Sequence, residues 1–337
     1  MQYKGIDIVK FIMALFVVIL HTHPLYAINR TADFLTADVI ARMAVPFFFA
    51  ATGFLLEKQI NVRDADARKT IVRYVRKVLG LYCVWTAVYL PIILYNKFIL
   101  NGESFTYGVF TLIRDFIFAG SYGQLWYLSA AAVGLLVVFV LRKYLGERKT
   151  AVLLLLLFAT GLTTQSYFGV TLAQIGPDGI LWKVMKAVKK VMVTCRNGVF
   201  FGSIFIYMGT WIARCDLKMK VWKAVSGLTI STLLFCAEAS YLWSIDSVRD
   251  KDMYLLLLPT VFFLMMLAIQ IHIEWDTVFL RKMSINIYLV HTAFRFIYRE
   301  FVGEHNENGI LLFLFTLAGT LAAAYLIERF ERRRGRT

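Results

Sequence analysis

The sequence predicts an all-α, polytopic integral membrane protein with about ten transmembrane helices. Of its 337 residues, 59% are hydrophobic and only 18% are charged, whereas soluble domains carry about 25% charged residues. The mean hydropathy is +0.64. Apolar segments close to the ~20 residues that a membrane helix needs recur along the whole chain. These observations exclude a soluble enzyme and a nucleic-acid-binding domain, because too little polar surface remains to face water.

Ten apolar segments can be delimited from the sequence. They fall near residues 6–26, 38–56, 78–99, 124–141, 150–173, 198–213, 223–243, 253–272, 283–301 and 309–327. The first is similar to a signal peptide, but no small-x-small cleavage pattern follows it, so we expect an uncleaved first helix. No linker divides the chain. We therefore expect one membrane domain over residues 1–330 and a basic cytoplasmic tail over 331–337.

Basic residues are distributed unevenly among the connecting segments. Residues 57–77 hold seven, 142–149 and 214–223 hold four each, and 328–337 hold five. Because basic residues accumulate in cytoplasmic loops, this distribution predicts two cytoplasmic termini and accounts for the net charge of +15 without a nucleic-acid partner. Segment 174–197 lies on the opposite side by parity yet holds five basic residues, and we expect an interfacial amphipathic helix there.

The first helix carries an ionisable side chain at a depth where it is costly and therefore a functional candidate. His21 lies about 16 Å along the helix axis from Lys10, in the outer half of the bilayer. His23 points in another direction. Asp7 is about 21 Å from His21, too far to orient that imidazole. We expect Asp7 to cap the helix start or to pair with a cytoplasmic base.

The second and ninth helices carry polar groups with two open interpretations. In the second, Arg42 shares a face with Pro46, which is expected to kink the helix and to expose carbonyl groups. In the ninth, Ser284, Tyr288 and His291 recur at helical spacing and share one face. A structural Tyr–His pair between helices and a ligand contact fit this pattern equally well.

Glu238 is the one acid well inside a predicted helix, at a depth comparable to that of His21. A carboxylate there needs a cation or a proton. The candidate cations are His21, Arg42 and the ammonium group of a substrate. Structural pairing and function both remain open for this residue.

These residues together resemble the membrane acyltransferase-3 family over nearly the whole chain. Five motifs of that family occur in the family's order, although Lys10 replaces the commoner Arg and Gly80 stands where many relatives have Pro. In this sequence the motifs are Asp7 with Lys10 and His21, Arg42 with Val45-Pro46-Phe47-Phe48 and Thr52-Gly53, Arg73 with Arg76, Leu125-Trp126-Tyr127-Leu128, and Ser284 with Tyr288, Leu289 and His291.

The resemblance implies an O-acyltransferase that moves an acyl group, with acetyl as the first candidate, from cytoplasmic acyl-CoA to a hydroxyl-bearing acceptor. It implies His21 as the catalytic base, and no metal is expected. We expect donor contacts from Lys10, Arg73, Arg76, Lys77, Trp126 and Tyr127. We expect substrate contacts from Arg42, Glu238, Tyr288 and His291, of which Glu238 rests on its depth alone.

One branch of the family is more similar still. Residues 196–201 and 85–91 resemble the N-terminal membrane domain of the membrane-bound serine/alanine racemases of vancomycin-resistance clusters. In those proteins a soluble racemase domain that uses pyridoxal phosphate follows the tenth helix. The alternative function is therefore L-serine uptake for a fused or partner racemase domain, in the plasma membrane of a bacterium. A purely structural anchor would leave His21, Arg42 and Glu238 unexplained.

Overall fold

The computed structural model describes residues 3–63, 67–176, 179, 182–183, 186–187, 193–303 and 309–334. Every regular element within these ranges is a helix, which confirms the all-α class. The chain divides into two compact units. The first, here named the terminal unit, comprises residues 1–48, 218–240 and 256–337. The second, here named the central unit, comprises residues 49–217 and 241–255.

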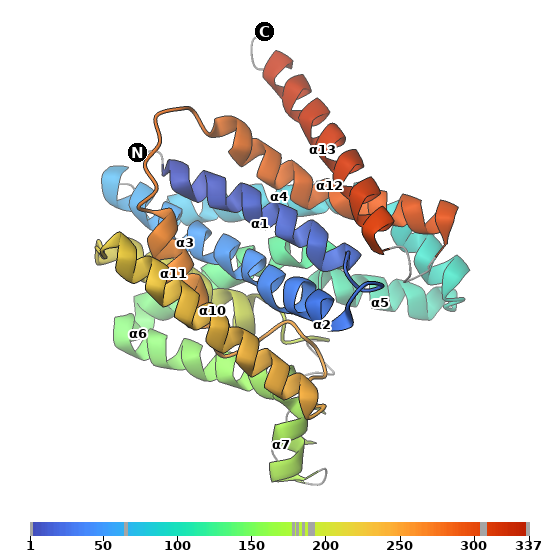
Figure 1. The fold of residues 1–337 in the computed structure, drawn as a ribbon, viewed down its shortest axis with the longest axis horizontal. Coiled ribbons are helices and arrows are strands. Elements are labelled where there is room, and N and C mark those ends of the chain that lie inside the picture. The colour runs from blue at the N-terminus through green and yellow to red at the C-terminus, as the bar shows by residue number, and fades with distance from the viewer. Residues whose placement is uncertain are drawn as a thin grey trace. The chain divides into compact units, whose positions relative to one another are not determined.

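The terminal unit is built from the two ends of the sequence, with α12 packed against both α1 and α13 (Figure 1). The start of α1 contacts the segment before α12 through Lys4, which donates hydrogen bonds to the carbonyl oxygens of Ile273 and Glu274, and through Asp7, which accepts a 2.8 Å hydrogen bond from the hydroxyl of Thr277. The elements of this unit are α1 (Lys4–Thr22), α2 (Arg30–Asp33), the π-helix η1 (Phe34–Val39), the 3₁₀ helix η2 (Ile40–Met43), the start of α3 (Ala44–Arg63), most of α10 (Val221–Ser244), α11 (Leu257–Ala268), α12 (Val278–Val302) and α13 (Gly309–Arg334).

The central unit is organised around α6, which packs against α4, α9 and η5. The regular run of α6 is broken at Gly146, whose φ of +73° is open to glycine but strained for other residues. The elements are the rest of α3, α4 (Ala67–Leu94), the π-helix η3 (Tyr95–Leu100), α5 (Phe105–Phe118), the 3₁₀ helix η4 (Gly123–Leu125), α6 (Trp126–Thr164), α7 (Phe168–Ile175), the π-helix η5 (Gly198–Gly202) and α9 (Ser203–Arg214).

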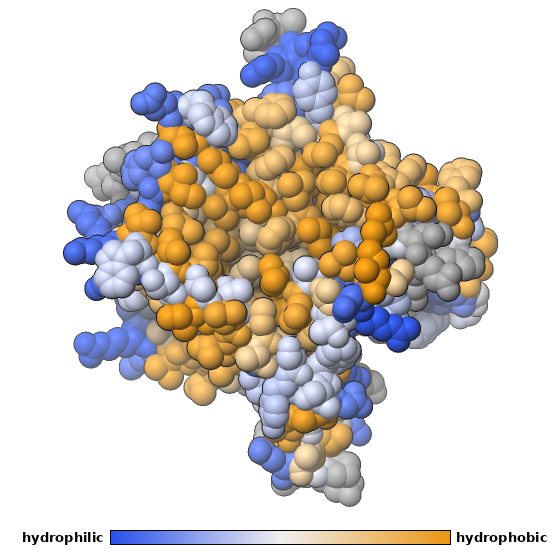
Figure 2. All heavy atoms as spheres, in the orientation of Figure 1, coloured by the Kyte–Doolittle hydropathy of each residue, from blue (hydrophilic) through white to orange (hydrophobic). Residues whose placement is uncertain are grey.

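Each of the ten predicted apolar segments coincides largely with helix among the described residues. By length and composition, six helical stretches in the described part of the chain can cross a membrane, and one of them, Phe105–Thr164, contains the predicted segment 124–141 and more than half of 150–173. Hydrophobic side chains cover most of the helices on the face that Figure 2 shows, and hydrophilic ones gather at helix ends such as the C-terminal end of α13. The count of ten and the sides of the termini stay predictions.

Three local expectations have different outcomes. The kink expected at Pro46 takes the form of irregular helix over Phe34–Met43, after which Pro46 falls in the first turn of α3, where a missing N–H is tolerated. The predicted segments near 78–99 and 124–141 place a connecting loop over residues 95–123, and the structure corrects this expectation because η3 and α5 lie there. The amphipathic helix expected over 174–197 lies partly outside the described residues, because 177–178, 180–181, 184–185 and 188–192 are not among them.

Candidate functional site

Two histidines from distant parts of the sequence lie together in the terminal unit. His21 is the penultimate residue of α1, and His291 lies in the middle of α12. Their rings stack with 5.1 Å between centroids and 30° between planes. The sequence singled out each histidine separately, and the structure brings them together.

The hydrogen bonds of His291 fix its tautomer. Its Nδ1 lies 2.9 Å from the carbonyl oxygen of Tyr288 and 3.2 Å from that of Ile287. Because carbonyl oxygens only accept, Nδ1 carries the hydrogen and Nε2 of the neutral ring holds a lone pair. The side chain is fully buried, and Nε2 has no hydrogen-bond partner in the described part of the chain. A water molecule or a hydroxyl group is the donor that this atom needs.

His23 has a different environment from His21. It ends α1 with a left-handed backbone (φ +49°), and its Nδ1 lies 2.8 Å from a carboxylate oxygen of Asp33. The other oxygen of Asp33 accepts a 3.0 Å hydrogen bond from the backbone N–H of Leu25. These bonds hold the chain in a turn after α1. His23 is therefore not part of the stack formed by His21 and His291.

The remaining candidates of the terminal unit are mostly held by neighbours from the protein itself. Arg42 forms an ion pair with Asp38, with 3.2 Å between Nη2 and Oδ1. Glu238 accepts a 2.8 Å hydrogen bond from the backbone N–H of Leu256, the residue directly before α11. Glu238 therefore serves as a cap for α11, a role that the depth argument did not anticipate.

Lys10 of α1 lies near the start of α12, and Tyr288 is a residue of α12. Lys10 interacts electrostatically with Asp7 and with Arg281, at the start of α12. Tyr288 is buried, and its ring lies 6.3 Å from the ring of His291 and 6.4 Å from that of Phe48. Tyr288 thus forms part of the aromatic wall around the histidine stack.

In the central unit, the first turns of α4 form a basic groove, a hollow of about 520 Å³. Its lining residues recur at helical spacing and are Arg68, Lys69, Val72, Arg73 and Arg76. Arg73 and Arg76 were predicted donor contacts, whereas Arg68 and Lys69 were counted only as orienting charge. Lys77, also predicted, is exposed on α4 but does not line the groove.

Tyr74, which follows Arg73 in α4, belongs to a small polar cluster with residues of α3 and α6. The hydroxyl of Tyr74 lies 3.3 Å from Oγ1 of Thr52, which also hydrogen-bonds Tyr127 of α6. The ring of Tyr127 packs at 4.8 Å from that of Phe49. Thr52 and Tyr127 came from two separate motifs, and the structure joins them through contacts that their spacing does not reveal.

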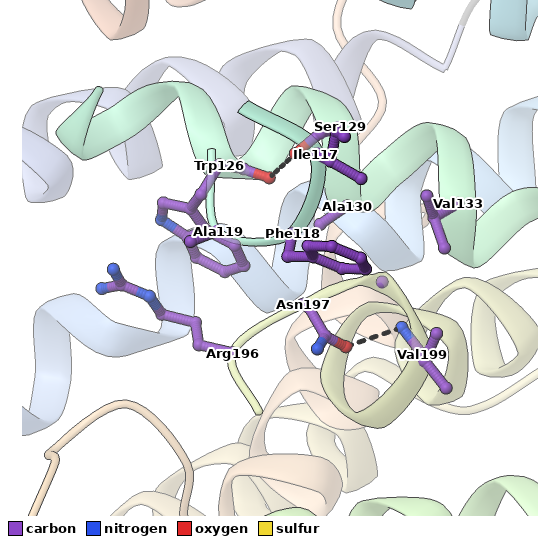
Figure 3. Close-up of a pocket in the computed structure, with 11 residues that line it drawn as sticks. Ile117, Phe118, Ala119, Trp126, Ser129, Ala130, Val133, Arg196, Asn197 and Val199 are labelled. Atoms are coloured by element: carbon purple, nitrogen blue, oxygen red, sulfur yellow. Dashed lines mark hydrogen bonds between the residues drawn. The ribbon is translucent and has the colours of Figure 1, made fainter. Parts of the chain in front are cut away.

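Trp126 lines a cavity of about 220 Å³ between the end of α5, the start of α6 and η5 (Figure 3). The guanidinium carbon of Arg196 lies 4.8 Å from the centre of the indole ring. Asn197 accepts hydrogen bonds from the backbone N–H groups of Val199 and Phe200, the second and third residues of η5. Arg196 and Asn197 therefore line a cavity for which sequence reasoning gave no signal beyond a branch resemblance.

The predicted site residues thus divide between the two units. Lys10, His21, Arg42, Glu238, Tyr288 and His291 belong to the terminal unit, and Arg73, Arg76, Lys77, Trp126 and Tyr127 belong to the central unit. Among the residues that the structure describes, no group of three His, Cys, Asp or Glu side chains is placed to hold a metal ion.

The helices and their apolar surfaces define a multi-pass membrane protein with buried polar groups. Residues 3–329 match the acyltransferase domain family known as acyltransferase 3. The chain belongs to that family, as its five motifs predicted.

Three curated relatives are similar to the chain, and all come from enterococci. An amino-acid racemase of Enterococcus faecalis is 30% identical over 77% of this chain and 35% of the relative. A serine/alanine racemase of Enterococcus gallinarum is 30% identical over 86% of this chain and 40% of the relative. A second amino-acid racemase of Enterococcus faecalis is 26% identical over 98% and 46%. The chain thus spans less than half the length of these relatives, and no solved structure matches it.

Proposed function

We propose that the chain transfers an acyl group, with acetyl as the first candidate, from cytoplasmic acyl-CoA to a hydroxyl-bearing acceptor at the bacterial plasma membrane. Membership of the acyltransferase 3 family supports acyl transfer. The observation that carries the proposal to this chain is the stacked pair of His21 and His291.

In this mechanism His21 is the general base. The acceptor hydroxyl gives its proton to the imidazole while its oxygen attacks the carbonyl carbon of the thioester. The C–S bond then breaks, and the proton passes from His21 to the departing thiolate. Such proton transfer typically contributes 10²–10⁴-fold to a rate. His291 holds the ring of His21 in place, and its Nε2 accepts a hydrogen bond from a water molecule, because the one hydrogen of the acceptor hydroxyl goes to His21.

The basic groove of the central unit is the proposed contact for the phosphates of acyl-CoA. Arginine and lysine form strong, charge-assisted hydrogen bonds with phosphate, and Arg73 and Arg76 offer them from one face of α4. Trp126 and Tyr127 are proposed to wall the path of the acyl group, and Lys10 to add a further donor contact. Exposure of the two arginines suits a ligand that arrives from water.

The test is thioester cleavage by the purified full chain in detergent micelles. Acetyl-CoA is supplied with or without L-serine or glycerol as a hydroxyl-bearing acceptor, and the released thiol is measured with a thiol-reactive dye. Acceptor-dependent release that is lost in His21→Ala supports the proposal. Release that is equally fast in His21→Ala removes His21 as the base.

A second candidate function is uptake of L-serine for a racemase domain, fused or separate. The names of the relatives favour it, since one is a serine/alanine racemase and its matched part covers 86% of this chain. Proteoliposomes that accumulate [14C]serine but release no CoA from acetyl-CoA would favour uptake. CoA release without accumulation would favour acyl transfer.

A further inference from the structure

The cavity beside Trp126 contains a buried donor that lacks an acceptor. Arg196 uses Nη1 for a 3.2 Å ion pair with Asp252, and its planar face covers the Trp126 ring. Its Nε–H is buried and has no hydrogen-bond partner in the described ranges of the chain. Asp252 already balances the charge of Arg196. What the cavity lacks is therefore an acceptor oxygen rather than a counter-ion.

The other polar residues of the cavity are already used within the protein. Ser129 donates a 3.0 Å hydrogen bond to the carbonyl oxygen of Trp126, and Asn197 caps the start of η5, as the dashed lines in Figure 3 show. The remaining walls are mostly apolar side chains, namely Ile117, Phe118, Ala119, Ala130, Val133 and Val199. The cavity thus offers one hydrogen-bond donor inside an apolar enclosure.

Two glycines allow these walls to come together. Gly120 adopts a φ of +90°, and a Cβ there would collide with the backbone of Trp126. A Cβ on Gly198 would collide with the backbone of α6 at Ala130. Close backbone contact at these two glycines therefore sets the spacing of the elements around the cavity.

The apolar wall continues outward along two helices. Ile117 and Val133 line the cavity while 57% and 39% exposed, respectively. Exposed apolar residues extend the same faces at helical spacing, with Phe110 and Ile113 on α5 and Leu136 and Val140 on α6. The stretch from Val133 to Val140 is about 10 Å long. In a membrane protein such an exposed apolar track faces lipid chains.

We propose that this cavity is a binding site for a glycerophospholipid of the surrounding bilayer. A phosphate or ester oxygen of the lipid accepts the hydrogen bond of Arg196 Nε–H, and one acyl chain lies along the track formed by α5 and α6. The cavity volume of about 220 Å³ is below the ~300–1,000 Å³ typical of drug-sized ligands, so it admits part of one chain rather than a whole lipid. The site shares Trp126 with the proposed path of the acyl group, but its donor, Arg196, has no part in the proposed acyl transfer.

The test uses the full chain, delipidated in detergent and titrated with phosphatidylglycerol, with bound lipid counted by native mass spectrometry. Arg196→Met removes the donor, and Val133→Trp fills the track at a position already 39% exposed. Arg249→Met is the matched control, because Arg249 makes the same kind of contact with Phe168, at 4.9 Å, away from the cavity. We expect one tightly bound lipid, about tenfold weaker in Arg196→Met, lost in Val133→Trp and unchanged in Arg249→Met.

Three outcomes would overturn the proposal. Equal lipid binding by the Arg196 and Arg249 variants would remove the donor from the site. Displacement of the lipid by acetyl-CoA would assign the cavity to the acyl donor, and displacement by L-serine would assign it to an amino acid. Acyl transfer is measured separately in the same samples, so its absence would leave the lipid result intact.

Discussion

The histidine stack of the terminal unit and the basic groove of the central unit differ in how firmly the protein holds their side chains. His291 is fully buried and anchored by two backbone carbonyls, and its ring lies against that of His21. Arg73 and Arg76 are exposed on α4. A group that transfers a proton needs fixed geometry. A group that attracts phosphate from water works through charge and tolerates motion.

The largest effect is expected from His21→Ala, which removes the proposed base. The rate of acetyl-CoA cleavage with acceptor should fall by about 10²–10⁴-fold, while the thermal unfolding midpoint changes little. His23→Ala is the control, because His23 pairs with Asp33 and lies outside the stack. A rate loss in the control as large as in His21→Ala would break the distinction between the two histidines.

The groove should respond more weakly, and in affinity rather than in rate. Replacing Arg73 and Arg76 together with Gln should weaken acetyl-CoA binding by about 10- to 30-fold, because exposed charge contacts are screened by solvent. Binding by the wild type should also weaken as salt is added. Arg148→Gln, which changes an exposed arginine outside the groove, should have no effect in isothermal titration. A lower turnover rate with unchanged acetyl-CoA affinity in the double variant would contradict the assignment of the groove as a phosphate contact.

His291→Phe sharpens the comparison within the stack. Phenylalanine keeps an aromatic ring against His21 but removes both ring nitrogens. We expect kcat to fall about tenfold, the size of one hydrogen bond, with KM nearly unchanged. A parallel ¹⁵N NMR spectrum of the histidine-labelled wild type should show an unprotonated Nε2 for His291. A protonated Nε2 in the neutral ring would refute the tautomer derived from its carbonyl contacts.

The smallest effect is expected at Glu238. Glu238→Gln keeps an oxygen for the N–H of Leu256 but loses the negative charge at the start of α11, which is worth about 0.3–1 kcal/mol of unfolding free energy. The unfolding midpoint in the melting curve should fall by the small shift that corresponds to this loss of free energy, and the fall should be the same with or without L-serine. Glu274→Gln, at an exposed position, serves as the reference. A loss of serine binding without a loss of stability would restore the ammonium contact as the role of Glu238.

The helical segments were predictable because the bilayer imposes the same length and composition on each of them. Helix α5 was missed since Arg114 and Asp115 interrupt its apolar run. In the structure these two residues pair with each other at 2.7 Å, so the charge that obscured the helix is largely balanced within it. Hydropathy counts both residues as polar and does not detect the pairing.

The sequence identified individual residues of the candidate site but not the contacts between them. His21 and His291 each stood out because an imidazole is unusual in an apolar helix. Nothing in their spacing showed that they would stack. For Glu238, depth in the helix predicted the need for a partner, yet the partner is a backbone N–H that every residue except proline possesses. Arg196 gave no chemical signal in the sequence, because its role depends on the cavity around it.

The histidine stack also has a consequence for how the protein is made. His21 and His291 are separated by 270 residues, and ribosomes add about 5–20 residues per second, so the first histidine precedes the second by roughly 15 to 50 s. During that interval α1 is inserted without the helix that completes its aromatic environment. The ring of His21 can therefore reach its final orientation only after α12 has been synthesised and has packed against α1, which makes the proposed active centre one of the last parts of the molecule to mature.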